Sequence, residues 1–151
     1  MKISTKARYG LRILIDIALK GGDRPRMIRE ISESQGISQK YIGRLILDLR
    51  KAGILRSVRG ARGGYILRKS PANISLLEIM ETMEGRMRLV KCLACPNSCK
   101  RSSTCASRDI WEDITNEMRE SFAKVSLADI ILKESVTVTA KSGVELAAVS
   151  E

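Results

Sequence analysis

The spacing of apolar residues in three successive segments of the first half restricts the possible fold more than any other feature of the sequence. Apolar residues recur at spacings of three and four in three successive segments, 5–20, 27–34 and 38–52. This period predicts three amphipathic helices. Gly21-Gly22 ends the first, and the turn Gly36-Ile37-Ser38 joins the second to the third, with Ser38 as a suitable N-cap. The segment therefore predicts a helix-turn-helix preceded by one supporting helix.

A glycine-rich basic tip lies between two short apolar runs directly after the third helix. The runs at 54–58 and 65–68 are strand candidates, and residues 59–64 read Arg-Gly-Ala-Arg-Gly-Gly. Strand, glycine loop and strand in succession predict a β-hairpin. Three helices followed by such a hairpin predict a winged helix-turn-helix, in which one helix enters the major groove of DNA and arginines of the wing favour the minor groove. A solvated turn is the alternative for the hairpin tip.

The rest of the chain is predicted to be helical around one irregular segment. Ser75 is a suitable N-cap for a helix to Met83, residues 107–124 form a longer helix, and residues 127–133 form a short one. We therefore expect a mainly α fold with a small β-hairpin wing and a long dimerisation helix. Its predicted parts are a DNA-binding region at 1–70, a cysteine-loop and dimerisation region at 71–134, and a poorly ordered tail at 135–151.

Basic residues are concentrated in the predicted DNA-binding region. Residues 1–70 hold 17 Lys and Arg against 5 Asp and Glu, a balance of +12, whereas residues 71–151 hold 10 against 12, a balance of −2. A basic part joined to a near-neutral part indicates a polyanion-binding surface. A basic surface that only solubilises the protein is the alternative.

Composition and local sequence exclude several other classes of function. Aromatic residues make up only 3% of the chain, which disfavours single-strand binding by base stacking. Because the chain contains no histidine, it cannot form imidazole-based catalytic sites or histidine-containing zinc sites. No nucleotide-binding loop or recognisable pair of catalytic acids is present, so we expect no enzyme. No apolar run approaches the ~18 residues of a membrane span and no signal-peptide core is visible, so we expect a cytoplasmic protein without a membrane partner.

The third helix carries the candidate base-reading side chains. Its buried stripe is predicted at Ile42, Leu45, Ile46 and Leu49, which places polar and basic residues on the opposite face. Gln and Arg bind adenine and guanine edges through paired hydrogen bonds, and Lys binds guanine or phosphate. With the wing arginines, the predicted DNA-binding residues are Ser38, Gln39, Lys40, Tyr41, Gly43, Arg44, Lys51, Arg59 and Arg62.

Gly43 is unusual within this helix, because glycine costs roughly 1 kcal/mol of helix propensity relative to alanine. Close approach of the helix to DNA and neutral drift explain it equally well.

The four cysteines lie in one loop, with the spacing Cys92-x2-Cys95-x3-Cys99-x5-Cys105. In a cytosolic chain such a group favours a metal or redox role over disulfides. Thiolates are the usual ligands of iron–sulfur clusters, and they also form four-thiolate zinc sites. The usual zinc spacing, two close pairs separated by a longer loop, is absent. A structural zinc site and four unliganded thiols remain as alternatives to an iron–sulfur cluster.

These motifs together resemble those of the IscR and NsrR type of bacterial iron–sulfur transcription regulator. The resemblance covers about residues 1–134 and rests on Lys6–Gly10, Ile31–Ser38, Tyr41, Leu49–Gly53, Ser57–Tyr65, and on Cys92, Cys99 and Cys105 with Trp111. It implies a homodimer that binds a palindromic operator in double-stranded DNA. It also implies control by an iron–sulfur cluster, usually 2Fe–2S, of genes for cluster biogenesis or stress responses.

The chain departs from this family at two positions. IscR-type proteins have a histidine ligand shortly after the third cysteine, where this chain has Arg108. Some relatives use an acidic residue of the first helix instead, but the matching stretch offers Arg8 and Arg12, and Asp16 lies further along. Gly43 stands where an IscR-type protein has an acidic side chain that restricts operator choice, so the operator preference stays open.

The fourth cluster ligand is therefore open, while the resemblance implies Cys92, Cys99 and Cys105 as the first three. We favour Cys95, the remaining thiol of the loop. Carboxylates at Asp109 or Glu112 are the oxygen-ligated alternatives.

An apolar stripe on the helix predicted at 107–124 indicates the dimer interface. Its members recur at spacings of three and four: Trp111, Ile114, Met118 and Phe122. We expect the stripe to pack against that of a second copy, which would set two recognition helices about 34 Å apart, one turn of DNA. The alternative is that the stripe packs on its own domain.

The sequence thus predicts a transcriptional regulator, repressor or activator, whose operator binding is controlled by an iron–sulfur cluster. A regulator with the same DNA-binding half that responds to thiol oxidation, nitric oxide or zinc is the first alternative. A small electron-transfer protein is an alternative from a different class.

Overall fold

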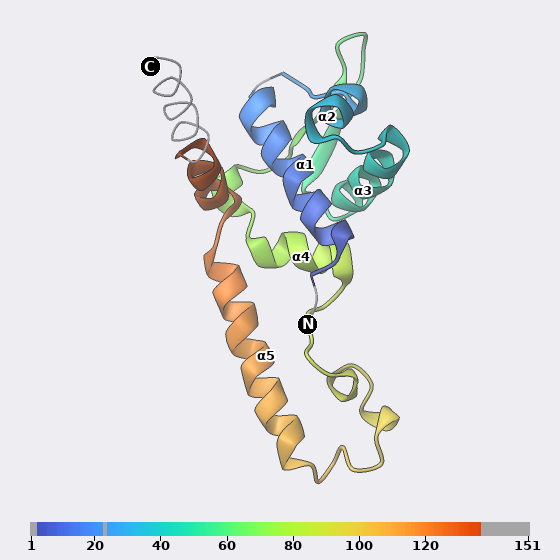
Figure 1. The fold of residues 1–151 in the computed structure, drawn as a ribbon, viewed down its shortest axis with the longest axis vertical. Coiled ribbons are helices and arrows are strands. Elements are labelled where there is room, and N and C mark those ends of the chain that lie inside the picture. Colours follow the sequence, from blue (N-terminus) through green and yellow to red (C-terminus); the bar gives the residue numbers. More distant parts are fainter. Residues whose placement is uncertain (1–2, 23, 137–151) are drawn as a thin grey trace, which may run out of the picture.

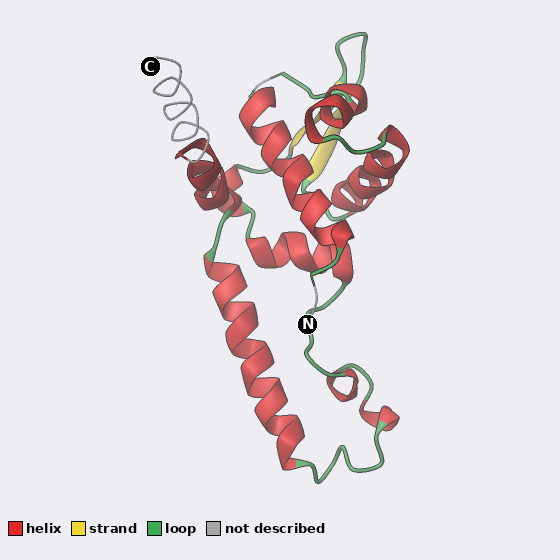
Figure 2. Ribbon diagram, viewed as in Figure 1, coloured by secondary structure: helices red, strands yellow, loops and turns green. Residues whose placement is uncertain are grey.

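The computed structural model describes residues 3–22 and 24–136 of the chain (Figure 1). Helices dominate these ranges, and the sheet within them is a two-stranded antiparallel hairpin (Figure 2). The elements in chain order are α1 (Thr5–Gly21), α2 (Ile28–Gln35), α3 (Gln39–Lys51), β1 (Leu55–Val58), β2 (Gly64–Leu67), η1 (Pro71–Asn73), α4 (Leu76–Glu84), η2 (Lys91–Leu93), η3 (Pro96–Ser98) and α5 (Ala106–Lys124). The predicted mainly α fold with a small hairpin is confirmed.

The C-terminal part of the described chain is also helical, over 127–136. Ser135 and Val136 belong to this helix, and the remainder of the predicted tail, 137–151, lies outside the described residues. Within the described ranges, no helix is both long enough and apolar enough to cross a membrane.

Serine caps and a glycine set the ends of the helices. Ser4, Ser38 and Ser75 each accept a hydrogen bond from a backbone N–H in the first turn of α1, α3 and α4. Gly36 follows α2 in the left-handed conformation, with φ of +65°, and its N–H bonds back to the Ser32 carbonyl at 2.9 Å. The turn between α2 and α3 is therefore encoded locally, as the sequence predicts.

One hydrophobic core joins the helices to the hairpin. It contains the predicted inward face of α3 together with residues of α1, α2, β1, α4 and the C-terminal helix: Ala7, Ile13, Leu14, Ile17, Ile31, Ile42, Leu45, Ile46, Leu49, Ile54, Leu55, Ile74, Ile79, Met80, Met83 and Leu127 among them. These residues come from both sides of position 70, and the division of the chain there stays a prediction. Figure 1 shows α5 extending away from α1–α3, with its N-terminal end and the cysteine loop far from the hairpin tip.

A buried carboxylate fastens α1 to α2 and to the hairpin. Asp16 of α1 is only 2% exposed, and its Oδ1 accepts hydrogen bonds from Nε and Nη2 of Arg26 at 3.1 and 3.0 Å. Its Oδ2 accepts from Gln35 Nε2 at 3.0 Å and from the Ser34 hydroxyl. The Arg26 backbone in turn pairs with Tyr65 of β2 through N–O distances of 3.0 and 2.9 Å. One charged group thus positions the hairpin relative to the helix-turn-helix.

The hydrogen bonds also determine how Asp16 titrates. Burial of the carboxyl raises its pKa, but hydrogen bonds from Ser34, Gln35, Arg26 and Lys20 together outweigh that effect, so the pKa of Asp16 lies below its ordinary value. A pKa lowered in the folded state means that the carboxylate stabilises the fold above the unfolded pKa, about 3.9. That stabilisation is lost as the pH falls through the folded-state pKa.

Asp16→Asn is expected to lower the free energy of unfolding by about 2–4 kcal/mol at pH 7, because Arg26 keeps its buried position and loses its closer charged partner, which leaves it with Glu30 at 3.5 Å. Urea unfolding followed by circular dichroism measures the change. Asp48→Asn is the matched control, since Asp48 pairs with Lys6 at 2.8 Å between side chains that are 35% and 41% exposed, and we expect a change within about 1 kcal/mol. The difference in the free energy of unfolding between the two variants should become smaller below about pH 4. Equal stability of Asp16→Asn and the parent at pH 7 would contradict this role.

Candidate nucleic-acid interface and cysteine loop

The outward face of α3 presents most of the residues predicted to bind DNA. Five of them are exposed on the side opposite the buried stripe: Ser38, Gln39, Lys40, Arg44 and Lys51. Asp48, the acid of this helix, is neutralised by Lys6. Within the described residues none of the three cations on this face takes part in an ion pair. The face is therefore a basic surface whose charges the described residues do not compensate through ion pairs.

Tyr41 and Gly43 have different surroundings from these exposed side chains. Tyr41 is half-buried, and its ring meets Tyr9 edge-on with the ring centroids 6.0 Å apart, so it also packs inside the domain. A Cβ added at Gly43 would lie 3.9 Å from Cδ1 of Ile28, an ordinary contact. Packing within the chain therefore does not require glycine at position 43.

Leu47 lies on the same outward face and is absent from the predicted set. Leu47 is 47% exposed, whereas Ile46 and Leu49, the nearest residues of the buried stripe, are buried. Its position three residues after Arg44 and four after Gly43 is the sequence signal that places it there.

The hairpin tip carries the two predicted wing arginines, Arg59 and Arg62, both exposed. The backbone turns too tightly here for larger residues. A Cβ at Gly63 would lie 2.4 Å from the Val58 carbonyl oxygen, and one at Gly64 would lie 2.5 Å from a carbonyl oxygen of the segment before α2. The glycines thus let the tip form while β2 stays against the helix-turn-helix, and the arginines project from it.

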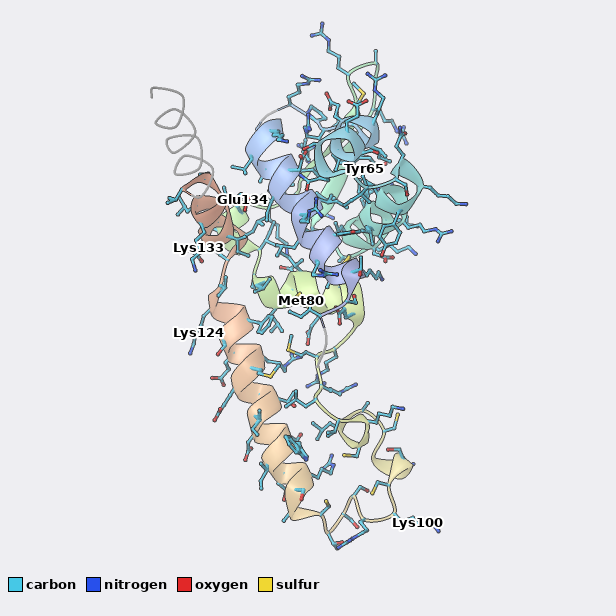
Figure 3. The ribbon with its side chains drawn as sticks, in the orientation of Figure 1. Tyr65, Met80, Lys100, Lys124, Lys133 and Glu134 are labelled. Atoms are coloured by element: carbon cyan, nitrogen blue, oxygen red, sulfur yellow. The ribbon has the colours of Figure 1, made fainter. Side chains whose placement is uncertain are left out.

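The cysteine loop lies at the other end of the molecule, as the labelled residues Tyr65 and Lys100 show (Figure 3). All four cysteines are free thiols; Cys92 and Cys105 are half-buried, whereas Cys95 and Cys99 are exposed. The carbonyls of the last three accept a backbone hydrogen bond from the third residue after each, at 2.9–3.1 Å. The thiols therefore sit on successive short turns. Across the described ranges, no three Cys, His, Asp or Glu residues gather closely enough to hold a metal ion.

The donor chemistry of the loop nevertheless fits an iron–sulfur cluster. Four free thiols on one loop supply the soft ligands that such a cluster takes. Arg108, at the position of the family's histidine, has a buried Nε with no hydrogen-bond partner in the described structure. An unsatisfied buried donor is costly, so this Nε is a donor that a bound group could use. Asp16 is no rival ligand, because its carboxylate is engaged at the hairpin by Arg26 and its neighbours.

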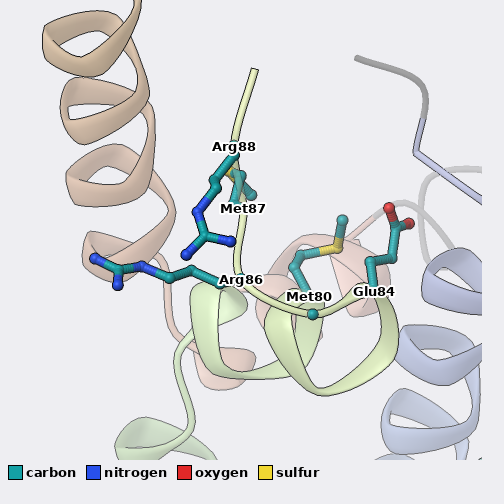
Figure 4. A pocket seen from close by; sticks show the side chains of 6 residues that line it. Met80, Glu84, Arg86, Met87 and Arg88 are labelled. Atoms are coloured by element: carbon teal, nitrogen blue, oxygen red, sulfur yellow. The ribbon is translucent and has the colours of Figure 1, made fainter. Parts of the chain in front are cut away.

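The root of the loop is tied to both α4 and α5. Glu81 of α4 accepts a hydrogen bond from the Met87 N–H at 2.9 Å and is paired with Arg119 of α5. Two hollows of about 130 and 120 Å³ are each lined by residues 86–88. Figure 4 shows Arg86 extending toward α5 with Arg88 beside it, and Glu84 on the other side of the first hollow.

The predicted apolar stripe of α5 is divided by the fold. Met118 and Phe122 are half-buried and pack against the protein's own core. Trp111 and Ile114 are 42% and 38% exposed, and Ile110 beside them is 57% exposed. The C-terminal half of the stripe thus packs on its own domain, and the N-terminal half forms an exposed apolar surface near the cysteine loop.

Comparison with known proteins agrees with this architecture. Residues 3–133 match the Rrf2 family, described as iron-dependent transcriptional regulators. The protein rrf2 of Nitratidesulfovibrio vulgaris is 37% identical over 136 residues, which cover 90% of this chain and 91% of that relative. The solved structure of CymR, titled the global cysteine regulator of B. subtilis, has a TM-score of 0.72 at 34% identity and covers 88% of this chain and 98% of its own.

A solved structure titled T. potens IscR is similarly close, with a TM-score of 0.70 and 34% identity over 89% of this chain and 88% of that one. The matched proteins thus include regulators named both IscR and CymR. Since the family match spans nearly the whole described chain, this protein is a member of the Rrf2 family of transcriptional regulators and binds DNA rather than catalysing a reaction.

Proposed function

We propose that this regulator binds a palindromic operator in double-stranded DNA through α3 and the hairpin wing, and that an iron–sulfur cluster on the cysteine loop controls this binding. The observation that carries the DNA part is the outward face of α3, where Lys40, Arg44 and Lys51 are exposed and lack ion-pair partners among the described residues. Such a face suits the polyanionic backbone and the base edges of the major groove.

Each part of this surface has its own role. Gln39, Lys40 and Arg44, in the first two turns of α3, are assigned to base edges, because the N-terminal residues of a recognition helix reach them. Lys51 in the last turn is assigned to phosphate. Arg59 and Arg62 are assigned to the minor groove, whose negative potential attracts arginine. Ser38 and Tyr41 hold the start of the helix in place.

The cysteine loop is the proposed sensing element. Cys92, Cys99, Cys105 and, as fourth ligand, Cys95 would hold the cluster, of 2Fe–2S type by family resemblance, which supplies a redox-active and chemically labile centre when bound. The chain's own residues then couple the loop to the fold: Glu81 binds the backbone at the root of the loop and the side chain of Arg119. The resemblance points to genes of cluster biogenesis as targets, in the cytoplasm.

A thiol-responsive regulator with the same DNA-binding half is the second candidate. Two observations favour it: the thiols of Cys95 and Cys99 are exposed, and a similar solved structure is titled a global cysteine regulator. Exposed thiols are open to oxidation without any bound cluster.

The proposed active form is a homodimer built on α5. The exposed apolar group Ile110, Trp111 and Ile114 lies on one side of α5 and away from the core. Apolar surface of this kind on a helix that projects from the domain suits a two-fold contact with a second copy.

Arg44→Ala and Arg59→Ala are each expected to weaken binding to an operator duplex, selected from a random pool, by roughly 5- to 150-fold, since a good base or groove contact is worth about 1–3 kcal/mol. Only Arg44→Ala should change the preferred bases. Fluorescence anisotropy at one fixed, moderate salt concentration measures both effects, because salt alone shifts the affinity. Lys124→Ala, at the end of α5, removes the same charge far from the interface and should bind like the parent. Parent-like binding by both arginine variants would refute this placement.

Alanine at each cysteine is expected to abolish cluster assembly if all four are ligands. Each variant is reconstituted with iron and sulfide without oxygen, and iron content, sulfide content and the visible absorption spectrum are measured. If Cys95→Ala keeps its full iron and sulfide content and an unchanged spectrum while the other three variants lose theirs, Cys95 is not a ligand. Asp109→Asn and Glu112→Gln are then tested next. Parent protein that takes up zinc and shows no visible absorption would exclude the cluster itself.

Trp111→Ala is expected to weaken the dimer about 30-fold or more, because a central aromatic residue typically contributes at least about 2 kcal/mol to an interface. Sedimentation equilibrium at micromolar concentration measures it. Leu19→Ala, which removes a similarly exposed apolar residue of α1, is the control and should leave the association unchanged. A parent protein that sediments as a monomer at this concentration would count against the dimer.

A further inference from the structure

We infer that Leu47 is a specificity-determining residue of α3 that reads a thymine of the operator through the thymine 5-methyl group. This inference rests on the proposed function of α3 as the recognition helix. It adds an apolar contact to a surface whose other assigned contacts are all polar.

Leu47 lies in the middle of the basic stripe of α3. Lys40, Arg44, Leu47 and Lys51 follow one another at spacings of four, three and four, which aligns them along one side of a helix. All four are exposed, whereas Ile46 and Asp48, the neighbours of Leu47 in sequence, are buried or paired with Lys6. The leucine therefore points where the flanking cations point.

Leu47 does not belong to the hydrophobic core of the described residues. It is 47% exposed, and within the described residues it is neither part of the core nor among the hydrophobic residues packed against it. Single exposed leucines are common on protein surfaces. This one, however, occupies a strip that is otherwise charged and faces the proposed ligand, so its environment changes when DNA binds.

The chemistry of the major groove offers a leucine one partner. Leucine forms no hydrogen bonds through its side chain, so it cannot use the donors and acceptors of adenine, guanine or cytosine. The 5-methyl group of thymine is the apolar feature of the major-groove edge. Contact between the two requires close approach of the helix, and Gly43, one turn earlier, leaves room for it because no side chain stands there.

The position of Leu47 relative to Arg44 also predicts where the thymine lies. Three residues of α-helix rise about 4.5 Å, and one base step along a strand rises about 3.4 Å. If Arg44 reads a guanine, the thymine read by Leu47 lies within one or two base steps of it, in each half of the palindrome.

Thymine-to-deoxyuridine replacement tests the inference, because it removes only the methyl group. The probe is a duplex selected from a random pool by the full-length protein, with each thymine of a half-site replaced in turn. At one position, we expect the parent to lose about 3- to 5-fold in affinity per half-site, as for burial of one methyl group. Leu47→Ala should bind the two duplexes equally, and Leu47→Met should restore the difference. Thermal melting checks that both variants fold, as expected at an exposed position.

Two results would overturn the inference. One is a parent protein whose affinity is unaffected by deoxyuridine at every position. The other is a Leu47→Ala variant with the same sensitivity to deoxyuridine as the parent. Both leave operator binding by α3 intact and so differ from failure of the proposed function, in which the parent selects no duplex from the pool and the inference falls with it.

Discussion

The pairing of Asp16 with Arg26 is the interaction on which the geometry of the DNA-binding half depends. The carboxylate takes hydrogen bonds from Ser34 and Gln35 at the end of α2, and Arg26 carries the backbone contact to Tyr65 of the hairpin. A buried charge is tolerated only when its oxygens are satisfied, and both oxygens of Asp16 are. Neither partner faces the proposed ligand. Their effect is to hold the hairpin against the helix-turn-helix, so that α3 and the wing are positioned together for the proposed contact with DNA.

A second polar contact joins α4 to the root of the cysteine loop and to α5. Glu81 joins the loop root at Met87 to α5 through Arg119, and α4, which carries Glu81, packs on α1 so closely that a Cβ at Gly10 would lie 2.6 Å from the sulfur of Met83. The loop and the proposed DNA-binding surface lie at opposite ends of the molecule, and α4, between them, contacts α1 and α3 on one side and α5 on the other. A rearrangement at the loop root would therefore act on a helix that shares the core of the DNA-binding half.

Local signals made much of this predictable. The serine caps of α3 and α4 and the inward face of α3 follow from spacing alone, because they involve residues within one or two turns of each other. The role of Asp16 does not, since Arg26, Ser34 and Gln35 lie 10 to 19 residues away, and the pair with Lys20 one turn along does not mark a buried carboxylate. The period of α5 likewise identifies an apolar stripe but not what covers it, which is why Met118 packs on its own domain while Trp111 is exposed. Leu47 could be placed on the α3 face by the same count, but its residue type gave no reason to include it among polar readers.

The sequence predicts which thiols the cysteine loop offers as ligands, but it does not predict how the loop arranges them in space. The hydrogen bonds of the loop explain this difference. Every backbone hydrogen bond within residues 90–104 of the described chain joins residues three or four positions apart, as in the turns at Cys95 and Cys99. Such short turns fix the backbone locally, and among the described residues η2 of the loop also contacts α5. The free energy that orders ligands around a metal centre comes from binding itself when the protein offers no preformed site. The loop is thus held at its root by Glu81 and at its end by α5, with mostly local backbone hydrogen bonds between, which suits the proposed role as a segment that is ordered further by binding.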